Sequence, residues 1–530
     1  MALYESVASA KEYSSMPPKP KSGDAQNIHL HGANQLLDDD QIMKPNMSPI
    51  HFCFIVHGHN GRPTDLSYLH HTIKAKATES GIFRAKSSGS CVVGRKSENS
   101  VTQNERKVRR RKRDRFFSRK KNNESDLHHD KHVGSDNDQL KGTLVVHNSV
   151  CNEGKTHDGI IKGGERLTNE MLEVIRSEVK QQEQQPKQKE VIHQEHNAEQ
   201  GHIDVTVSLV GNSLGGLYGR YGVAQLAEVL GNPTQISDET NETRYYYLLD
   251  GFIRIHLNVF CSTASPMLGC ANHTYIPIPR TAEIGVAQVL GETGSDLFRV
   301  NDLVQTMATS HRFLKPLASF RKRIAYANAF GTDFPVPTAT AAFLDSKSDS
   351  PHYFDEDFEE NEDDEIAGEI KRKMERQSKE KGCPASERGL IAAILYTPRL
   401  QLEENIRAKT KGDVLTAMSS SLDSLGWKKV FIDIRKEIPA AVSLPTMFKS
   451  DGTKCPIRQL KSSSHVVRSC DLDRAVSTSS SYRLGLPLGH NAICAFSRGT
   501  VSTAVNSGGR PVMDSLAIDL TNNISLWHET

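Results

Sequence analysis

The chain has 530 residues, a formal net charge of +2 and an apolar share of 37%. That share is below the ~45–50% usual in globular domains (a range that also counts glycine), so we expect a core of ordinary size together with long polar segments. The near-neutral balance excludes a chain that is basic or acidic throughout. The nine cysteines form no C-x-x-C pair, which argues against a disulfide framework or a zinc site and favours a reducing compartment.

The chain opens with a polar segment, followed by a first strand, turn and helix. Residues 1–48 are rich in Pro, Lys, Ser, Asp and Asn, a composition typical of disorder. The apolar run His51–Val56 predicts a strand, residues 57–61 a glycine-rich turn, and residues 65–76 a helix. We expect one folded domain over residues 49–528.

Three polar insertions interrupt this domain, at about 88–141, 181–201 and 346–383. They are basic, Gln-rich and acidic in turn, and we expect each to be disordered. The basic block at 106–121 is either a solvated loop, a nuclear-import signal or a contact for an anionic membrane surface. Two phenylalanines beside its charges favour the membrane contact, and specific binding of nucleic acid is not expected.

The cellular location is predicted from two features that the sequence does not contain. It contains no run of about 18 apolar residues, so we expect no membrane-spanning helix. The first residues carry no apolar core of a secretory signal. We therefore expect a cytoplasmic protein, with membrane association or a nuclear location as alternatives that depend on the basic block.

Strands and helices alternate through the rest of the domain. The predicted strands are 144–147, 207–210, 255–260, 322–328 and 427–435. The predicted helices are 164–179, 217–230, 280–315 (a helical region) and 511–520. This alternation favours an α/β fold with a mostly parallel sheet, flanked by helices, in which loops at the carboxyl ends of the strands share one cleft.

The most informative stretch is the segment Val207–Tyr221. An apolar strand ends at Gly211, residues 211–215 fit G-x-S-x-G around Ser213, and an amphipathic helix follows. Strand, sharp turn and helix form the context of a nucleophile elbow, in which a serine is held at the top of the sheet near a helix N-terminus. The sequence therefore predicts that Ser213 is a catalytic nucleophile.

A serine nucleophile needs a base, and the base needs a carboxylate that orients it. In this fold class the three follow one another as Ser, Asp or Glu, then His. Asp333, in a turn just after a predicted strand, is the preferred acid, and Asp433 and Asp250 are rivals. His490 is the preferred base.

His465 is the alternative base, in a more polar setting than His490. Two N–H donors should stabilise the oxyanion. We expect one from Leu214, directly after the serine, and the other from His59 in the first turn, while His57 shapes that turn. Neither a metal nor an organic cofactor is required by this chemistry.

Together these residues resemble the DUF676 putative serine esterase (lipase-like) family of α/β-hydrolases. Phe54–Leu66 is similar to the family's oxyanion segment, and Leu209–Tyr221 to its elbow, with Asn212 where many lipases have His. Phe260–Gly269 is similar to a further family stretch, with Met267 where His is common.

Two later loops extend the resemblance. Asn328–Pro337 resembles the Asp-bearing loop of the family, and His490–Ile493 its late His loop. The resemblance implies the α/β-hydrolase fold and a triad of Ser213, Asp333 and His490. It covers about 48–90, 142–180, 202–345 and 385–525; these four ranges leave the insertions outside.

The predicted function is a serine hydrolase that cleaves carboxylic esters of lipids or other acyl groups. An acyl-protein thioesterase would use the same residues on a different substrate. A non-catalytic hydrolase-like scaffold, binding partners or membrane through its charged insertions, is the alternative from another functional class.

Overall fold

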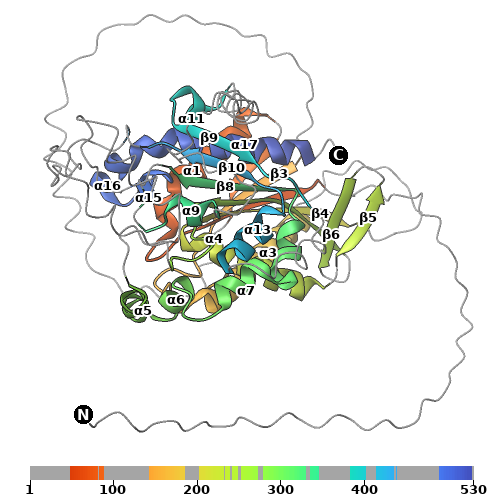
Figure 1. Ribbon diagram of the computed structural model, residues 1–530. Coiled ribbons are helices and arrows are strands. Elements are labelled where there is room, and N and C mark those ends of the chain that lie inside the picture. Colours follow the sequence, from red (N-terminus) through yellow and green to blue (C-terminus); the bar gives the residue numbers. More distant parts are fainter. Residues whose placement is uncertain are drawn as a thin grey trace, which may run out of the picture. The chain divides into compact units, whose positions relative to one another are not determined.

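The computed structural model describes residues 48–81, 83–88, 142–184, 202–231, 233–238, 241–248, 252–271, 279–329, 333, 335–344, 382–400, 414–434, 437 and 489–527 (Figure 1). All of them belong to one structural unit, residues 45–530. The basic block at 106–121, His465 and Asp250 lie outside the described residues, as do residues 1–47 and most of each predicted insertion.

A mostly parallel sheet forms the centre of this unit. Within the described residues it has 10 strands, with the order β2-β3-β1-β4-β7-β8-β10-β9 and a β5–β6 pair beside β7. The strands are β1 (Ile50–Val56), β2 (Phe83–Ser87), β3 (Gly142–Asn148), β4 (Ile203–Asn212), β5 (Thr234–Asp238), β6 (Asn241–Leu248), β7 (Ile253–Thr263), β8 (Lys322–Asn328), β9 (Ile391–Tyr396) and β10 (Lys428–Ile432). The β5–β6, β6–β7 and β9–β10 pairs are antiparallel, and the other pairs are parallel.

Helices cover both faces of the sheet (Figure 1). On one face α1 (Ser67–Glu79) packs against α17 (Arg510–Trp527), beside α11 (Pro384–Glu387). On the other face lie α3 (Ile160–Glu183), α4 (Leu214–Leu230), α7 (Leu303–Thr309), α8 (His311–Ala318) and α13 (Val414–Asp423). The shorter elements are η1 (Pro63–Leu66), α5 (Arg280–Val289), α6 (Gly291–Leu297), α9 (Thr338–Ala341), α15 (Gly489–Ala492), α16 (Gly499–Val505) and η4 (Asn506–Gly509).

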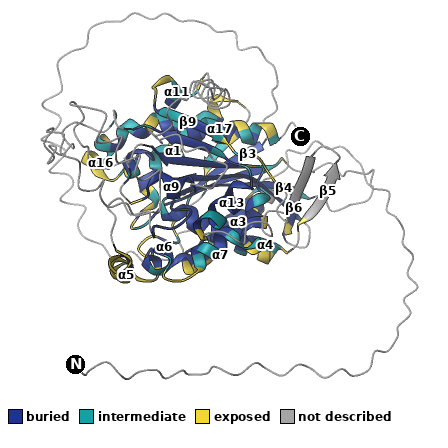
Figure 2. Ribbon diagram, in the orientation of Figure 1, coloured by how far each residue is buried: buried dark blue, intermediate teal, exposed yellow. Residues whose placement is uncertain are grey.

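The alternation of side chains along β1 shows how the sequence builds these layers. Phe52, Phe54 and Val56 belong to the core on the α3–α4 face, whereas Cys53 and Ile55 belong to the core on the α1–α17 face. Successive side chains of a strand point to opposite faces, so a strand buried on both sides reads as one continuous apolar run. Figure 2 shows the sheet buried throughout its centre.

The predicted α/β fold with a mostly parallel sheet is confirmed, and it is the fold of the α/β-hydrolases. The structure adds β2 and the β5–β6 hairpin, which the sequence did not predict. The helical region 280–315 consists of separate short helices, and the helix after Ser213 starts at Leu214, three residues earlier than predicted. No helix among the described residues is long and apolar enough to cross a membrane.

The two tryptophans of the chain lie on opposite faces of the sheet. Trp427 packs in the core on the α3–α4 face, where its Nε1 donates a hydrogen bond to Leu422 O at 2.8 Å. Trp527, the last residue of α17, packs edge-on against the rings of His51 and His256, with centroids 5.5 Å and 5.4 Å away. Each tryptophan thus belongs to a different layer.

Candidate active site

Ser213 occupies a sharp turn between β4 and α4. Its backbone angles are φ 53° and ψ −127°, a combination that residues other than glycine rarely adopt. Ser213 is partly exposed, while every other residue from Ile203 to Ala224 is buried. The turn therefore presents the hydroxyl of Ser213 at the surface of an otherwise buried strand and helix.

Close backbone contacts explain the glycines on either side of this serine. A Cβ atom on Gly211 would lie 2.4 Å from Gly216 Cα, and one on Gly215 would lie 2.2 Å from Val56 O. Neither position has room for a side chain, because the start of α4 packs directly against the ends of β4 and β1. The G-x-S-x-G spacing is thus a packing requirement of this turn.

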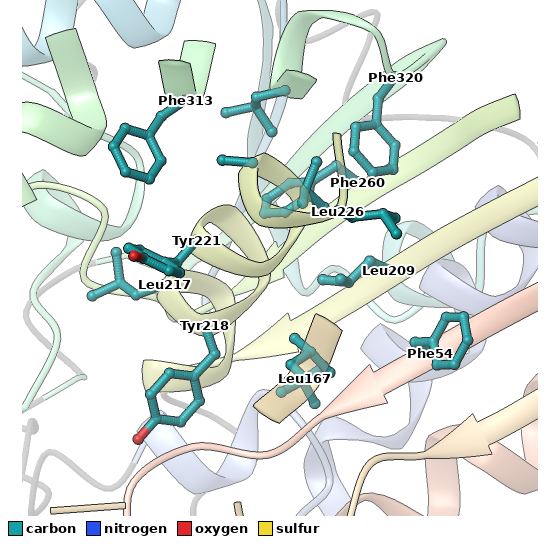
Figure 3. Close-up of a cluster of buried hydrophobic side chains, with 14 of the residues drawn as sticks. Phe54, Leu167, Leu209, Leu217, Tyr218, Tyr221, Leu226, Phe260, Phe313 and Phe320 are labelled. Carbon is teal, nitrogen blue, oxygen red and sulfur yellow. The ribbon is translucent and has the colours of Figure 1, made fainter. Parts of the chain in front are cut away.

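The elbow helix is anchored in the larger core. Leu217 and Tyr221 of α4 pack with Leu209 of β4 and Phe313 of α8 (Figure 3). This packing fixes the helix and, through it, the backbone of Ser213.

The residue before the serine ties the elbow to the neighbouring strand. Asn212 Nδ2 donates to Thr263 Oγ1 at 3.1 Å, and the backbone N–H of Ser213 donates to Thr263 O at 2.9 Å. Asn212 therefore bridges β4 and β7. This contact gives the asparagine a structural task at the position where many lipases have histidine.

The acid and base predicted from the sequence lie in contact. His490, in the short helix α15, places Nδ1 3.0 Å from Asp333 Oδ2. Asn328 Nδ2 donates to the same oxygen at 2.8 Å, and the backbone N–H of Val336 donates to Oδ1 at 2.9 Å. Asp333 is 1% exposed, so these donors replace water around its carboxylate.

The carboxylate of Asp333 determines the tautomer of His490. An ionised carboxylate only accepts hydrogen bonds, so Nδ1 of His490 must carry the proton. The lone pair of the neutral ring is then on Nε2, on the far side of the imidazole from Asp333.

Ser213 and Asp333 follow strands at the same edge of the sheet. Ser213 follows β4 and Asp333 follows β8, with β7 between them in a parallel arrangement. Two strand spacings correspond to about 10 Å, a distance that one imidazole ring with its hydrogen bonds can span. His490 reaches this edge from a segment near the end of the chain.

The turn after β1 lies directly against the serine. A Cβ atom on Gly58 would lie 2.6 Å from Ser213 Cβ and 3.1 Å from Ser213 Oγ. The backbone of this turn is closed by a hydrogen bond from Gly61 N to Gly58 O at 3.0 Å. The structure thus places the predicted oxyanion turn beside Ser213.

The two histidines of this turn are held differently. His57 is 2% exposed, its Nδ1 lies 3.1 Å from Gly58 O, and burial lowers its pKa. His59 stacks edge-on against His157 at 4.6 Å, and burial likewise lowers the pKa of His59. Both rings are therefore neutral near pH 7, and neither adds a positive charge beside Ser213.

Two other residues noted in the sequence occupy different surroundings. Met267 is fully buried in the core, where its carbonyl accepts a hydrogen bond from Arg220 at 3.0 Å. Asp433 follows β10 and donates its backbone N–H to Leu390 O at 2.8 Å. The carboxylate that contacts His490 is that of Asp333.

The structure reveals a serine–histidine–acid array, built from residues other than those of the elbow, that the sequence did not predict. Ser88 Oγ lies 2.5 Å from His147 Nδ1, and His147 Nε2 lies 3.1 Å from Glu170 Oε1. Burial alone would raise the pKa of Glu170, but hydrogen bonds from His147, Ser149 and Val150 N outweigh it and lower the pKa to about 2. The array borders a cavity of about 430 Å³.

Geometry distinguishes this array from the elbow. Ser88 donates its backbone N–H to Val146 O at 3.3 Å, in line with the β2–β3 pairing, so it sits on no sharp turn. The nearby N–H of Val150 donates to Glu170 at 2.8 Å and is not available to an oxyanion. His147 and Glu170 therefore form a structural network. The sequence did not predict this network, because its residues are dispersed along the chain and form no motif.

Among the residues that the structure describes, no group of three or more His, Cys, Asp or Glu side chains could hold a metal ion.

The fold and the elbow define this chain as an α/β-hydrolase-type protein. Residues 121–344 match the model of the family described as "Putative serine esterase (DUF676)". The segment contains Ser213 and Asp333, whereas the Gly58 turn and His490 lie outside it. No curated protein matches the chain.

Proposed function

We propose that the protein is a serine hydrolase that cleaves carboxylic esters of lipids or other acyl groups. The observation that carries the proposal is the 3.0 Å contact between His490 Nδ1 and Asp333 Oδ2. It orients a neutral imidazole at the sheet edge where Ser213 is displayed. The match of residues 121–344 to a family of putative serine esterases supports the same chemistry.

The proposed reaction has two half-reactions, the acylation and the deacylation of Ser213. Ser213 Oγ attacks the ester carbonyl while Nε2 of His490 takes its proton, and the backbone N–H groups of Leu214 and His59 stabilise the oxyanion. The protonated ring then donates to the leaving alcohol, which leaves an acyl group on Ser213. Water, deprotonated by His490, releases the acid and restores the serine.

Labelling with a fluorophosphonate tests the nucleophile. Wild-type protein should be labelled and should hydrolyse p-nitrophenyl esters, and Ser213→Ala should do neither. Ser88→Ala is the matched control, because it removes the serine of the other array, and it should keep both properties. Labelling that survives in Ser213→Ala but is lost in Ser88→Ala would identify Ser88 as the nucleophile and overturn the proposal.

The substrate is tested with a series of acyl chains. Esters of p-nitrophenol from acetate to palmitate, compared with acyl thioesters of the same length, separate an esterase from an acyl-protein thioesterase. The proposal expects the higher kcat/KM on oxygen esters. A preference for thioesters that is lost in Ser213→Ala would still support the triad but would identify acyl thioesters as the substrate.

A further inference from the structure

A charged pair connects the segment after His490 to the turn after β1. Arg498 Nε lies 3.0 Å from Asp65 Oδ1, and Nη2 of the same guanidinium contacts Asp65 Oδ2. Two parallel N–H···O contacts between one guanidinium and one carboxylate form a bidentate pair, the most directional ion pair available to side chains. Nη2 also donates to Asn60 O at 2.9 Å.

Asp65 lies in η1, directly after the turn that lies against the serine. Its carboxylate is 1% exposed and accepts a hydrogen bond from Arg62 N at 2.7 Å. Its own carbonyl accepts one from Ser497 N at 2.9 Å. Asn60, whose carbonyl Arg498 also holds, has a φ of 51° and lies two residues after Gly58. Arg498 therefore contacts the turn at Asn60 and the adjoining η1 at Asp65.

The other end of the connection leads back to His490. The N–H of Ile493 donates to Gly489 O at 2.8 Å, and that of Phe496 donates to Asn491 O at 3.1 Å, so the segment folds tightly on itself. The guanidinium of Arg498 lies 5.0 Å from the centroid of the Phe496 ring. Continuous contacts thus run from the helix of His490 through Arg498 to the Gly58 turn.

From this geometry we infer that Arg498 and Asp65 are positioning residues, which set the placement of the base relative to the oxyanion donors. The inference rests on the proposed function. His490 and His59 belong to segments more than 400 residues apart in the sequence. The contact between Arg498 and Asp65, which are 433 positions apart, joins these segments. Misplacing a catalytic group by about 1 Å can cost roughly 100-fold in rate, so the pair controls turnover without touching the substrate.

The pair is exposed at one end and buried at the other. The Arg498 side chain is 40% exposed and that of Asp65 is 1% exposed. Removing Arg498 leaves a buried carboxylate without its charged partner, which can also lower the stability of the fold, so stability has to be measured beside turnover. Arg312 and Glu228 form a second two-pronged pair, 46% and 42% exposed, on α8 and α4. This second pair is a control for the loss of a bidentate contact away from the candidate site.

The experiment compares Arg498→Met with Arg312→Met on p-nitrophenyl butyrate. We expect kcat to fall about tenfold or more in Arg498→Met, with KM within about twofold of wild type, because the positioning acts on the chemical step. Arg312→Met should match wild type. Arg498→Lys keeps the charge but cannot form the bidentate contact, so its kcat should lie between those of wild type and Arg498→Met. Thermal melting should show that both methionine variants are folded.

Two further readouts exclude a merely structural effect. Asp65→Asn combined with Arg498→Met should be no slower than the worse single variant, because both remove one contact. The acid limb of the pH profile of kcat/KM should stay in place, since the Asp333–His490 contact is untouched. A loss below tenfold, an additive double variant or a displaced acid limb would overturn the inference. Turnover that survives Ser213→Ala would instead overturn the proposed function.

Discussion

The carboxylate of Asp333 is a buried acceptor with three donors around it, and one of them is the imidazole of His490. Asn328 and Val336 N keep the carboxylate in place whether or not the histidine is present. Asn328 and Val336 therefore fix the position of Asp333, and the charge of the Asp333 carboxylate then orients His490.

Asp333→Asn should lower kcat by roughly 10³- to 10⁴-fold, because the amide can donate to Nδ1 and so favour the wrong tautomer. The variant should fold, since Asn is nearly isosteric with Asp. Ester hydrolysis and the rate of fluorophosphonate labelling measure the effect. Asp433→Asn is the control, and a larger loss in that variant would make Asp433 the acid.

Glu170 supports the fold through its ionised form. The pKa of Glu170 falls from 4.5 to about 2, and ionised Glu170 therefore stabilises the folded state above pH 4.5. This contribution is lost as the pH falls from about 4.5 to about 2. Glu170→Gln should reduce the free energy of unfolding by about 3 kcal/mol at pH 7.

The difference between Glu170→Gln and wild type should shrink when urea unfolding is repeated at pH 3. Glu173→Gln removes an exposed carboxylate from the same helix and should change the stability by no more than about 0.5 kcal/mol. An equal loss in both variants, or a loss independent of pH, would contradict the role given to the buried network.

At the scale of elements, the site depends on how closely the β1 turn approaches the elbow. Gly58→Ala would place a methyl group 2.6 Å from Ser213 Cβ and 3.1 Å from its Oγ. The turn must shift to make room. We expect kcat to fall about 100-fold or more, because the shift displaces the oxyanion donors.

Gly285→Ala is the matched control for this substitution. Gly285 lies in α5, and a Cβ atom there meets nothing within 4 Å, so the variant should be active and slightly more stable. Ester hydrolysis and thermal melting are measured for both. Normal turnover in Gly58→Ala would show that the turn does not serve the reaction.

The sequence predicts those parts of the site that are local in the chain. The strand–turn–helix around Ser213 is contained in a few residues, and its glycines are dictated by backbone contacts that any such turn makes. Asp333 and His490 were predicted only from their order and from short loops, yet they meet at 3.0 Å. The Arg498–Asp65 contact left no pattern, because a side-chain pair 433 positions apart has no periodicity to detect.

For the whole molecule, apolar periodicity predicts the central strands and fails at the edges. β1, β4 and β8 are buried at almost every position and contain apolar stretches, whereas β2 has the mixed sequence FRAKS with a single buried residue. Such edge strands are specified by their neighbour and not by their own composition. The sequence also did not predict the β5–β6 hairpin.

The basic block at 106–121, outside the described residues, gives a prediction for the intact chain. We propose that it attracts the protein to anionic membranes. Replacing its eight Lys and Arg between positions 106 and 115 by Gln should abolish binding to phosphatidylserine vesicles, since each basic residue near such a surface contributes about 1 kcal/mol.

Co-sedimentation at low and high salt measures this binding, and neutral phosphatidylcholine vesicles are the control. Hydrolysis of a short soluble ester should stay at the wild-type rate, because the substitutions do not alter the described site. Vesicle binding that persists in the variant, or that ignores salt, would assign the contact to another surface.

The placement of the two tryptophans on opposite faces of the sheet makes the molecule its own optical probe. Trp427 reports on the layer of α3 and α4, which carries the nucleophile, and Trp527 on the closing helix α17. Single Trp→Phe variants therefore leave one emission signal for each layer. Coincident denaturation curves would show that both layers melt cooperatively, and separated curves would identify which side of the sheet opens first.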